Sequence, residues 1–141
     1  MSPVNVTPSV AKARQCILVM NKDREMPRLL NRTLKPKGYD IVIVVDYDEA
    51  LNKLETVHPD MVIMDTYSTD ADSLRILDTI RKRSDVPIIV ITSDNEPDTL
   101  KTVFAHGADD FIRKPFDIRI FIARIKAKLR RYHGEVISPP E

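Results

Sequence analysis

The sequence is poor in the residues that mark several classes of protein. It has one cysteine, no tryptophan and only three glycines in 141 residues. A single cysteine cannot form a disulfide framework, and Cys16 lies in an apolar run, where a small buried side chain is expected rather than a reactive thiol. No apolar run approaches the roughly 18 residues that a membrane helix needs, and residues 1–15 lack the hydrophobic centre of a secretory signal. We therefore expect a soluble cytoplasmic domain with no membrane partner.

The chain also lacks an excess of charge of either sign. Lys and Arg total 22 against 21 for Asp and Glu, which gives a net charge of +1. The cations between Arg119 and Arg131 come with no interleaved aromatic residues and no recognition motif, so they predict a solvated helix face. We expect no direct binding of nucleic acid by this domain.

The length and the 43% hydrophobic content fit one globular domain. Residues 1–13 contain prolines, serines and threonines without a sustained period and are predicted to be a flexible leader. The folded domain is expected over 14–131. Residues 132–141 turn to glycine, serine and proline, which predicts a linker or tail.

Short apolar runs alternate with segments of helical spacing. The runs rich in Ile, Val or Met predict five strands, at Cys16–Met20, Ile41–Val45, Met61–Met64, Ile88–Ile91 and Phe111–Ile112. Between them, apolar residues recur at intervals of three and four and predict five helices: Met26–Leu34, Ala50–Val57, Leu74–Ile80 with its N-cap at Asp72, a short helix beginning near Pro97, and Ile118–Leu129. This alternation predicts an α/β fold, a doubly wound three-layer sandwich with a five-stranded parallel sheet, flavodoxin-like in topology.

Each predicted strand ends on polar residues. Parallel sheets place their chemistry just beyond the carboxyl ends of their strands. We therefore expect one shared edge for the residues that follow the five strands: Asn21, Lys22 and Asp23, Asp46, Asp65, Thr92 to Asp94, and Arg113 to Pro115. Asp65 closes the buried run Met61–Met64 and is the first candidate for a reacting group.

Residues 14–131 resemble the receiver domain of bacterial two-component response regulators, which has the CheY-like fold. The motifs that carry the resemblance are Met61 to Asp65, Pro87 to Thr92, and Gly107 to Phe116. By that resemblance, the site consists of a phospho-acceptor, a switch hydroxyl, a switch aromatic, an invariant lysine and the cis proline after it, matched here by Asp65, Thr92, Phe111, Lys114 and Pro115.

The resemblance implies a signalling switch rather than an enzyme, with at most self-phosphorylation and slow autodephosphorylation. Asp65 would take a phosphoryl group from a phosphohistidine on a histidine kinase, and Lys114 and Mg²⁺ would stabilise the transferred charge. Thr92 and Phe111 would then move and change the output surface.

The sequence departs from the family at the metal site. The family ends its first strand with two acids that hold Mg²⁺, and this chain has Asn21 and Lys22 there, followed by Asp23. Mg²⁺ prefers hard oxygen ligands with at least one or two carboxylates, so we expect no cofactor unless the receiver is conventional, in which case Asp65 and Asp23 would bind Mg²⁺. Our hypothesis is that Lys22 stands in for the metal and that Asp65 is phosphorylated poorly or not at all.

The segments after the third and fourth strands also differ from the family. Thr69 and Ser73 replace the preferred proline and glycine. Tyr67 and Asp94 occupy the positions that tune dephosphorylation in the family.

The Gly-Ala-Asp-Asp motif and the last helix resemble the OmpR/PhoB-type branch, whose receivers precede a winged-helix DNA-binding domain. That branch forms homodimers through its fourth helix, fifth strand and fifth helix, with ion pairs at positions matched by Asp109, Asp110, Arg124 and Arg131. Leu100 and Ile120 fall where the branch has a facing arginine and glutamate. Either a hydrophobic contact has replaced that ion pair, or Ile120 is an ordinary surface residue and Leu100 packs inward.

The favoured function is therefore a receiver that switches dimerisation or a transcriptional output domain. A pseudo-receiver that docks proteins without phosphorylation is the alternative. A flavodoxin-like cofactor binder is a remote third, because it needs a phosphate-cradling loop after the first strand and residues 21–24 contain no glycine.

Overall fold

The computed structural model describes residues 14–21, 25–66, 70–94 and 96–133. The predictions for Lys22, Asp23, Tyr67, Thr69, the leader and most of the tail lie outside these residues, as does the side chain of Arg131. Five strands are present in the described chain, one for each predicted run: β1 (Gln15–Met20), β2 (Tyr39–Val44), β3 (Met61–Thr66), β4 (Ile88–Thr92) and β5 (Asp110–Arg113).

The helices alternate with the strands. They are α2 (Glu25–Leu34) with the short 3-10 turn η2 (Lys35–Lys37), α3 (Tyr47–Val57), α4 (Ala71–Arg83), α5 (Thr99–Ala105) and α6 (Ile118–His133). The five helices predicted from apolar spacing are thus all present.

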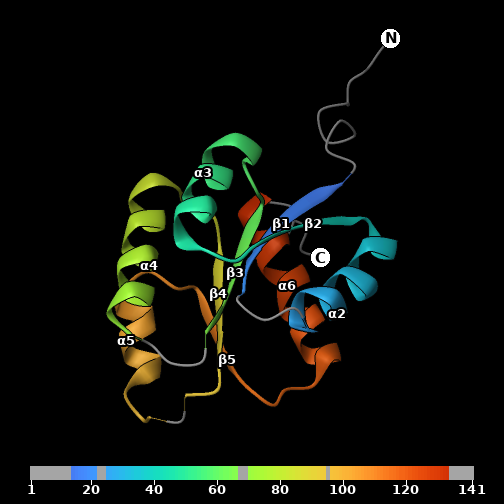
Figure 1. The fold of residues 1–141 in the computed structure, drawn as a ribbon. Helices are drawn as coiled ribbons and strands as arrows, with labels where there is room; N and C mark the ends of the chain where they lie inside the picture. Colours follow the sequence, from blue (N-terminus) through green and yellow to red (C-terminus); the bar gives the residue numbers. More distant parts are fainter. Residues whose placement is uncertain (1–13, 22–24, 67–69, 95, 134–141) are drawn as a thin grey trace.

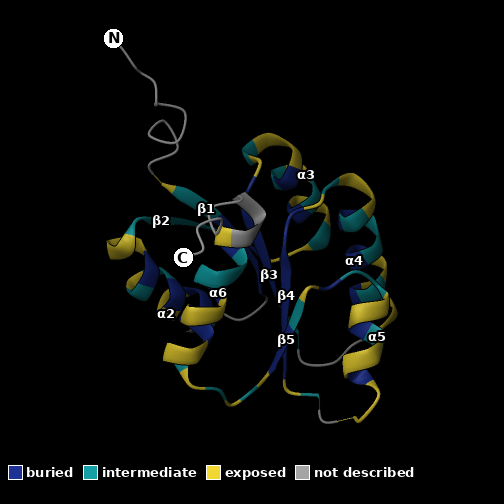
Figure 2. Cartoon of the chain, turned by 180° about the vertical axis from the view of Figure 1, so that it is seen from behind, coloured by how far each residue is buried: buried dark blue, intermediate teal, exposed yellow. Residues whose placement is uncertain are grey.

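The strands form one parallel sheet in the order β2-β1-β3-β4-β5 (Figure 1). Helices α2 and α6 cover one face, and α3, α4 and α5 cover the other. The inner strands are buried on both faces, as Figure 2 shows, because each face packs against a helical layer. The predicted doubly wound α/β sandwich is confirmed.

The register brings the strand ends to one edge of the sheet. Met20 lies opposite Met64 in the pairing of β1 with β3, and Thr66 lies opposite Thr92 in the pairing of β3 with β4. Asn21, Asp65 and Thr92 therefore meet at the same edge, although more than twenty residues separate each from the next along the chain.

Two predicted helix starts were wrong. The N-cap of α4 is Asp70, whose Oδ1 accepts a hydrogen bond from Ser73 N at 2.8 Å, and Asp72 lies in the first turn. The side chain that reaches the third amide of the helix defines the cap, so Asp70 takes the role. Helix α5 begins at Thr99 after Asp98, and Pro97 precedes the cap instead of opening the helix.

Candidate functional site

Asp65 lies at the carboxyl edge of the sheet, where β3 delivers it from the core. Its side chain is only 3% exposed, and its Oδ1 lies 2.7 Å from the Nζ atom of Lys114. Its Oδ2 accepts a hydrogen bond from Asn21 Nδ2 at 2.6 Å. Both carboxylate oxygens are therefore held by nitrogen donors, one of them cationic.

The backbone fixes the two donors. Asn21 follows β1 and is 5% exposed, and its backbone N–H donates to Val44 O at 3.0 Å. Lys114 follows β5, and its amide donates to Thr92 O at 2.9 Å. The Lys114–Pro115 peptide bond is cis, as the resemblance implied. The strand ends of β1, β3 and β5 thus converge on one carboxylate, as predicted. Asp46, which follows β2, instead caps α3: its Oδ1 accepts a hydrogen bond from Glu49 N at 2.7 Å.

The predicted switch hydroxyl and switch aromatic are both buried, and Thr92 adjoins the cluster through the bond from Lys114 N to its carbonyl oxygen. Thr92 is fully buried, and its Oγ1 accepts a hydrogen bond from Asp94 N at 3.0 Å. Phe111 is 9% exposed, and the guanidinium of Arg113 lies 5.4 Å from its ring centroid. In this structure the Thr92 hydroxyl is therefore bonded to the backbone, and the Phe111 ring is buried in the core.

Arg113 was predicted only as a polar residue at the end of the fifth strand, with no role of its own. Its Nε donates to Asp94 O at 3.0 Å and its Nη2 to Glu96 O at 3.2 Å. It thereby ties the end of β5 to the segment after β4 while it covers the ring of Phe111. Its place two residues after Phe111 was the available signal, because residues i and i+2 of a strand lie on the same face.

The described side chains around Asp65 supply too few oxygen ligands for Mg²⁺; Asp23, the other predicted ligand, lies outside the described residues. Mg²⁺ needs oxygen ligands and usually one or two carboxylates, whereas the described pocket offers one carboxylate whose oxygens both accept from nitrogen. An amide stands opposite it at position 21, and the sequence places an ammonium at position 22. Within the described residues, no group of three His, Cys, Asp or Glu side chains could hold a metal ion.

The predicted dimer surface is built from α5, β5 and α6. Leu100 is 44% exposed and Ile120 is 57% exposed, so the interpretation that Leu100 packs inward was wrong. Phe104 was missed, yet it lies one helical turn after Leu100 and is 43% exposed. Arg124 Nη1 lies 3.4 Å from Asp110 Oδ1 within the monomer.

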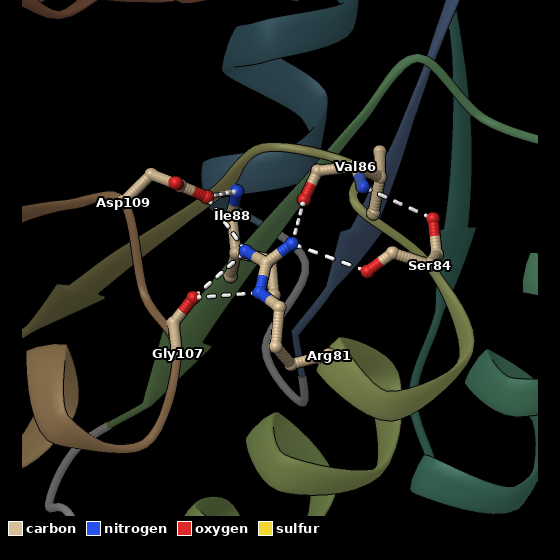
Figure 3. A network of polar contacts seen from close by, with 6 residues as sticks. All are labelled: Arg81, Ser84, Val86, Ile88, Gly107 and Asp109. Carbon is tan, nitrogen blue, oxygen red and sulfur yellow. Dashed lines mark hydrogen bonds and ion pairs between the residues drawn. The ribbon is translucent and has the colours of Figure 1, made fainter.

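Asp109 has an intramolecular role that the sequence did not indicate. Its Oδ2 lies 2.7 Å from Arg81 Nη2 and accepts a hydrogen bond from Ile88 N at 2.8 Å (Figure 3). The Arg81 guanidinium also donates to the carbonyl oxygens of Ser84, Val86 and Gly107. This arginine clamp joins the end of α4 to the starts of β4 and β5.

The helices of the described chain include none long and apolar enough to cross a membrane.

Comparisons with known proteins agree with the fold and the motifs. The sequence profile of the response regulator receiver domain matches residues 17–126. The probable transcriptional regulator ycf27 of Porphyridium aerugineum is 36% identical over 118 residues, which are 84% of this chain and 49% of that protein. The chain therefore spans about half the length of this curated relative.

Solved structures show the same arrangement of elements. A two-component response regulator from Clostridium difficile has a TM-score of 0.77 and 28% identity, over 84% of this chain and 98% of that one. A CheY-like receiver domain protein from Methanospirillum hungatei has a TM-score of 0.78 over 86% of this chain and 98% of that one; at 24% identity it supports the fold alone.

The parallel sheet, the convergence of Asp65 with Lys114, the Thr92 strand end and the matching sequence profile all lead to one conclusion. The chain belongs to the family of response regulator receiver domains, the signal-receiving modules of two-component systems.

Proposed function

We propose that this receiver transmits its signal through protein contacts, with Asp65 held as the anion of an internal ion pair instead of serving as a metal-dependent phospho-acceptor. One observation carries the proposal: both oxygens of a 3% exposed carboxylate are bound by nitrogen donors at 2.7 and 2.6 Å. A phosphoryl donor would have to displace these bonds without a divalent cation to neutralise the incoming charge.

The charges of the neighbouring residues support the same reading. Lys22 and Lys114 bring two positive charges against two negative charges from Asp65 and Asp23. These four charges sum to zero, so our proposal needs no metal for neutrality. A dication about 4 Å from one ammonium would meet roughly 8 kcal/mol of repulsion at an effective dielectric near 20.

The test is to restore the acidic pair. We expect the wild-type domain to gain no phosphoryl group, by intact mass, when incubated with phosphoramidate and millimolar Mg²⁺. The double variant Asn21→Asp/Lys22→Asp should gain one, and only with Mg²⁺ present. Adding Asp65→Asn to that variant is the control and should abolish the gain.

Stoichiometric Mg²⁺-dependent phosphorylation of the wild type at Asp65 would overturn the proposal. If the restored pair also stays unmodified, the substituted residues are not the reason for the inactivity, and the explanation by charge fails.

A conventional phospho-switch is the second candidate, and the arrangement of Asp65, Lys114 and Thr92 favours it. In that mechanism a carboxylate oxygen of Asp65 attacks the phosphorus of a phosphohistidine. The P–N bond breaks, and the imidazole leaves with the bond's electron pair and takes up a proton. The mass measurement above separates the two candidates.

The output surface fits a homodimer held by apolar contact. Leu100 and Ile120 are both exposed on the α5–β5–α6 face, at positions where an arginine and a glutamate pair across the dimer in the OmpR/PhoB-type branch. An apolar pair needs no phosphorylation to associate. Because the relative ycf27 is named as a probable transcriptional regulator, we further propose an output domain that regulates transcription.

Sedimentation velocity tests this contact. Ile120→Glu should dissociate the dimer. Ile43→Glu serves as the matched control, because Ile43 is 43% exposed on the edge strand β2, away from this face. The pair Leu100→Arg/Ile120→Glu should restore association by recreating the ion pair. An unchanged dimer in Ile120→Glu would exclude the contact.

A further inference from the structure

The layer formed by α2, η2 and α6 is strongly basic. Helix α6 has six Lys and Arg residues and no Asp or Glu over its 16 residues. The α2–η2 segment adds four cations, Arg28, Arg32, Lys35 and Lys37, against the single acid Glu25. The net charge of +1 for the whole chain hides this concentration of cations on one face of the sheet.

Helices α2 and α6 lie side by side on the same face of the sheet (Figures 1 and 2). A groove is lined by residues of α2, η2 and α6. It encloses about 310 Å³ and is lined by Thr33, Lys37, Ile118, Arg119, Ile122, Ala123 and Lys126. The lining combines apolar residues with cations: we call Ile118, Ile122 and the small Ala123 its apolar floor, and Lys37, Arg119 and Lys126 its cationic rim. We call it the α2–α6 groove.

Two of the three rim cations lack an acidic partner. Neither Lys37 nor Lys126 has a carboxylate within 4 Å among the residues that the structure describes. Arg119 does: its Nη2 lies 3.0 Å from Asp117 Oδ2, and this hydrogen bond holds the pKa of Asp117 below its ordinary value. Lys37 and Lys126 are therefore the charges open to a ligand.

The groove is separate from the output face. Arg124 contacts Asp110 and Phe111 on the β5 side of α6, and Ile120 lies one turn before it. Arg119, Ala123 and Lys126 recur at spacings of four and three and lie along the side of the helix that faces α2. A ligand in the groove would therefore contact a different side of α6 from the one that carries Ile120 and Arg124.

We propose that the α2–α6 groove binds an acidic amphipathic helix of a partner protein. Apolar side chains of that helix would pack on Ile118, Ile122 and Ala123, while its Asp and Glu residues would face Lys37 and Lys126. The apolar floor favours a polypeptide over nucleic acid, because a phosphate backbone has no apolar surface to bury there. The groove lining also has no aromatic side chain on which a base could stack.

The test uses a fluorescein-labelled helical peptide of about 15 residues, with leucines at three- and four-residue spacing and glutamates elsewhere, titrated by anisotropy at low salt. The counterpart peptide, with lysine in place of glutamate, should not bind. The charge reversal Lys37→Glu/Lys126→Glu should weaken binding of the acidic peptide by about tenfold. The control Lys53→Glu/Lys82→Glu makes the same change of net charge on α3 and α4 and should have less than about a twofold effect.

One variant should tighten binding. Asp117→Asn removes the charge that engages Arg119, while asparagine can still accept the hydrogen bond that Asp117 Oδ1 takes from Arg119 N at 2.8 Å at the start of α6. Affinity for the acidic peptide should rise by about two- to threefold.

Amide shifts in ¹⁵N-HSQC spectra should locate the bound peptide at Thr33 and Ala123, with Leu100 unmoved. Equal weakening by the α3–α4 control would mean that bulk charge alone is responsible and would overturn the proposal. No binding by the acidic peptide would overturn it also. A duplex DNA that binds through Lys37 and Lys126 where the peptide does not would show that the partner is a nucleic acid.

Discussion

Replacing Asp65 by asparagine tests the ion-pair interpretation through the sign of a stability change. The Asp65–Lys114 pair, at 2.7 Å, has a gross Coulomb attraction of about 6 kcal/mol at an effective dielectric near 20. Desolvation of a 3% exposed carboxylate and a 23% exposed lysine side chain offsets most of it. The net contribution expected of hydrogen bonds to a charged group is then about 1.5 to 3 kcal/mol.

Asparagine keeps the shape of the side chain but changes its bonding. It removes the negative charge beside Lys114. Its NH₂ group must also face another donor, either the Lys114 ammonium or the NH₂ of Asn21, which in the wild type donates to Asp65 Oδ2. We expect Asp65→Asn to lower the free energy of unfolding by about 2 kcal/mol. In a receiver with an intact acidic pair, the same change would relieve repulsion between carboxylates and would instead stabilise the fold.

Urea unfolding followed by far-ultraviolet circular dichroism measures the change, since the chain has no tryptophan. A double-mutant cycle with Lys114→Met should return a coupling of about 1 to 2 kcal/mol between the two side chains. Asp72→Asn is the control, because the ion pair of Asp72 with Arg75 is exposed: 71% of the Asp72 side chain and 66% of the Arg75 side chain are accessible to solvent. Its free energy of unfolding should change by no more than about 0.5 kcal/mol. A stabilised Asp65→Asn variant would refute the reasoning.

Three further predictions concern the arginine clamp and the start of α6. Arg81→Lys should cost about 2 to 3 kcal/mol in urea unfolding, because a lysine ammonium cannot reproduce the forked bonds to Gly107, Val86 and Asp109; a change under about 0.5 kcal/mol would show that the clamp is dispensable. Gly107→Ala should destabilise the fold more than Gly38→Ala. Both glycines have positive φ angles, of 111° and 99°, so both substitutions strain the backbone. A new Cβ at position 107 would also lie 3.1 Å from Arg81 Cβ, whereas one at position 38 would meet nothing within 4 Å. Equal losses would assign the whole cost to backbone strain. The Asp117 carboxyl should titrate below its ordinary pKa by carbon-detected NMR, and Arg119→Ala should raise that pKa, because the side-chain hydrogen bond from Arg119 is the largest cause of the shift. The stabilisation from this bond is present above the ordinary pKa of Asp117 and is lost as the pH falls through the lowered pKa. An unchanged titration of Asp117 in Arg119→Ala would contradict this cause.

The sequence was enough to predict the architecture and the convergence at Asp65. Each inner strand is a continuous apolar run, and the helices between them repeat apolar residues at three and four, so the doubly wound sheet followed from periodicity alone. Parallel strands end at one edge, which is why the contact of Lys114 with Asp65 was predictable across 49 residues.

Other contacts could be identified only from the tertiary structure, because they depend on the exact ends of helices and on side-chain rotamers. The N-cap at Asp70, the bond from Asn21 to Asp65 and the clamp of Arg81 on Asp109 each join a flexible polar side chain to a partner chosen by local backbone geometry. Several partners lie within reach of such a side chain, and periodicity does not distinguish among them.

Composition and spacing thus determined the fold and the strand-end site, and the resemblance to receiver domains implied the loss of the acidic pair. The tertiary structure decided which donors hold Asp65, that Leu100 is exposed, and that cations of η2 and α6 line one groove. The physical reason is that hydrophobic burial acts along each element with a regular period, whereas polar contacts depend on distances between elements that only the packed fold sets.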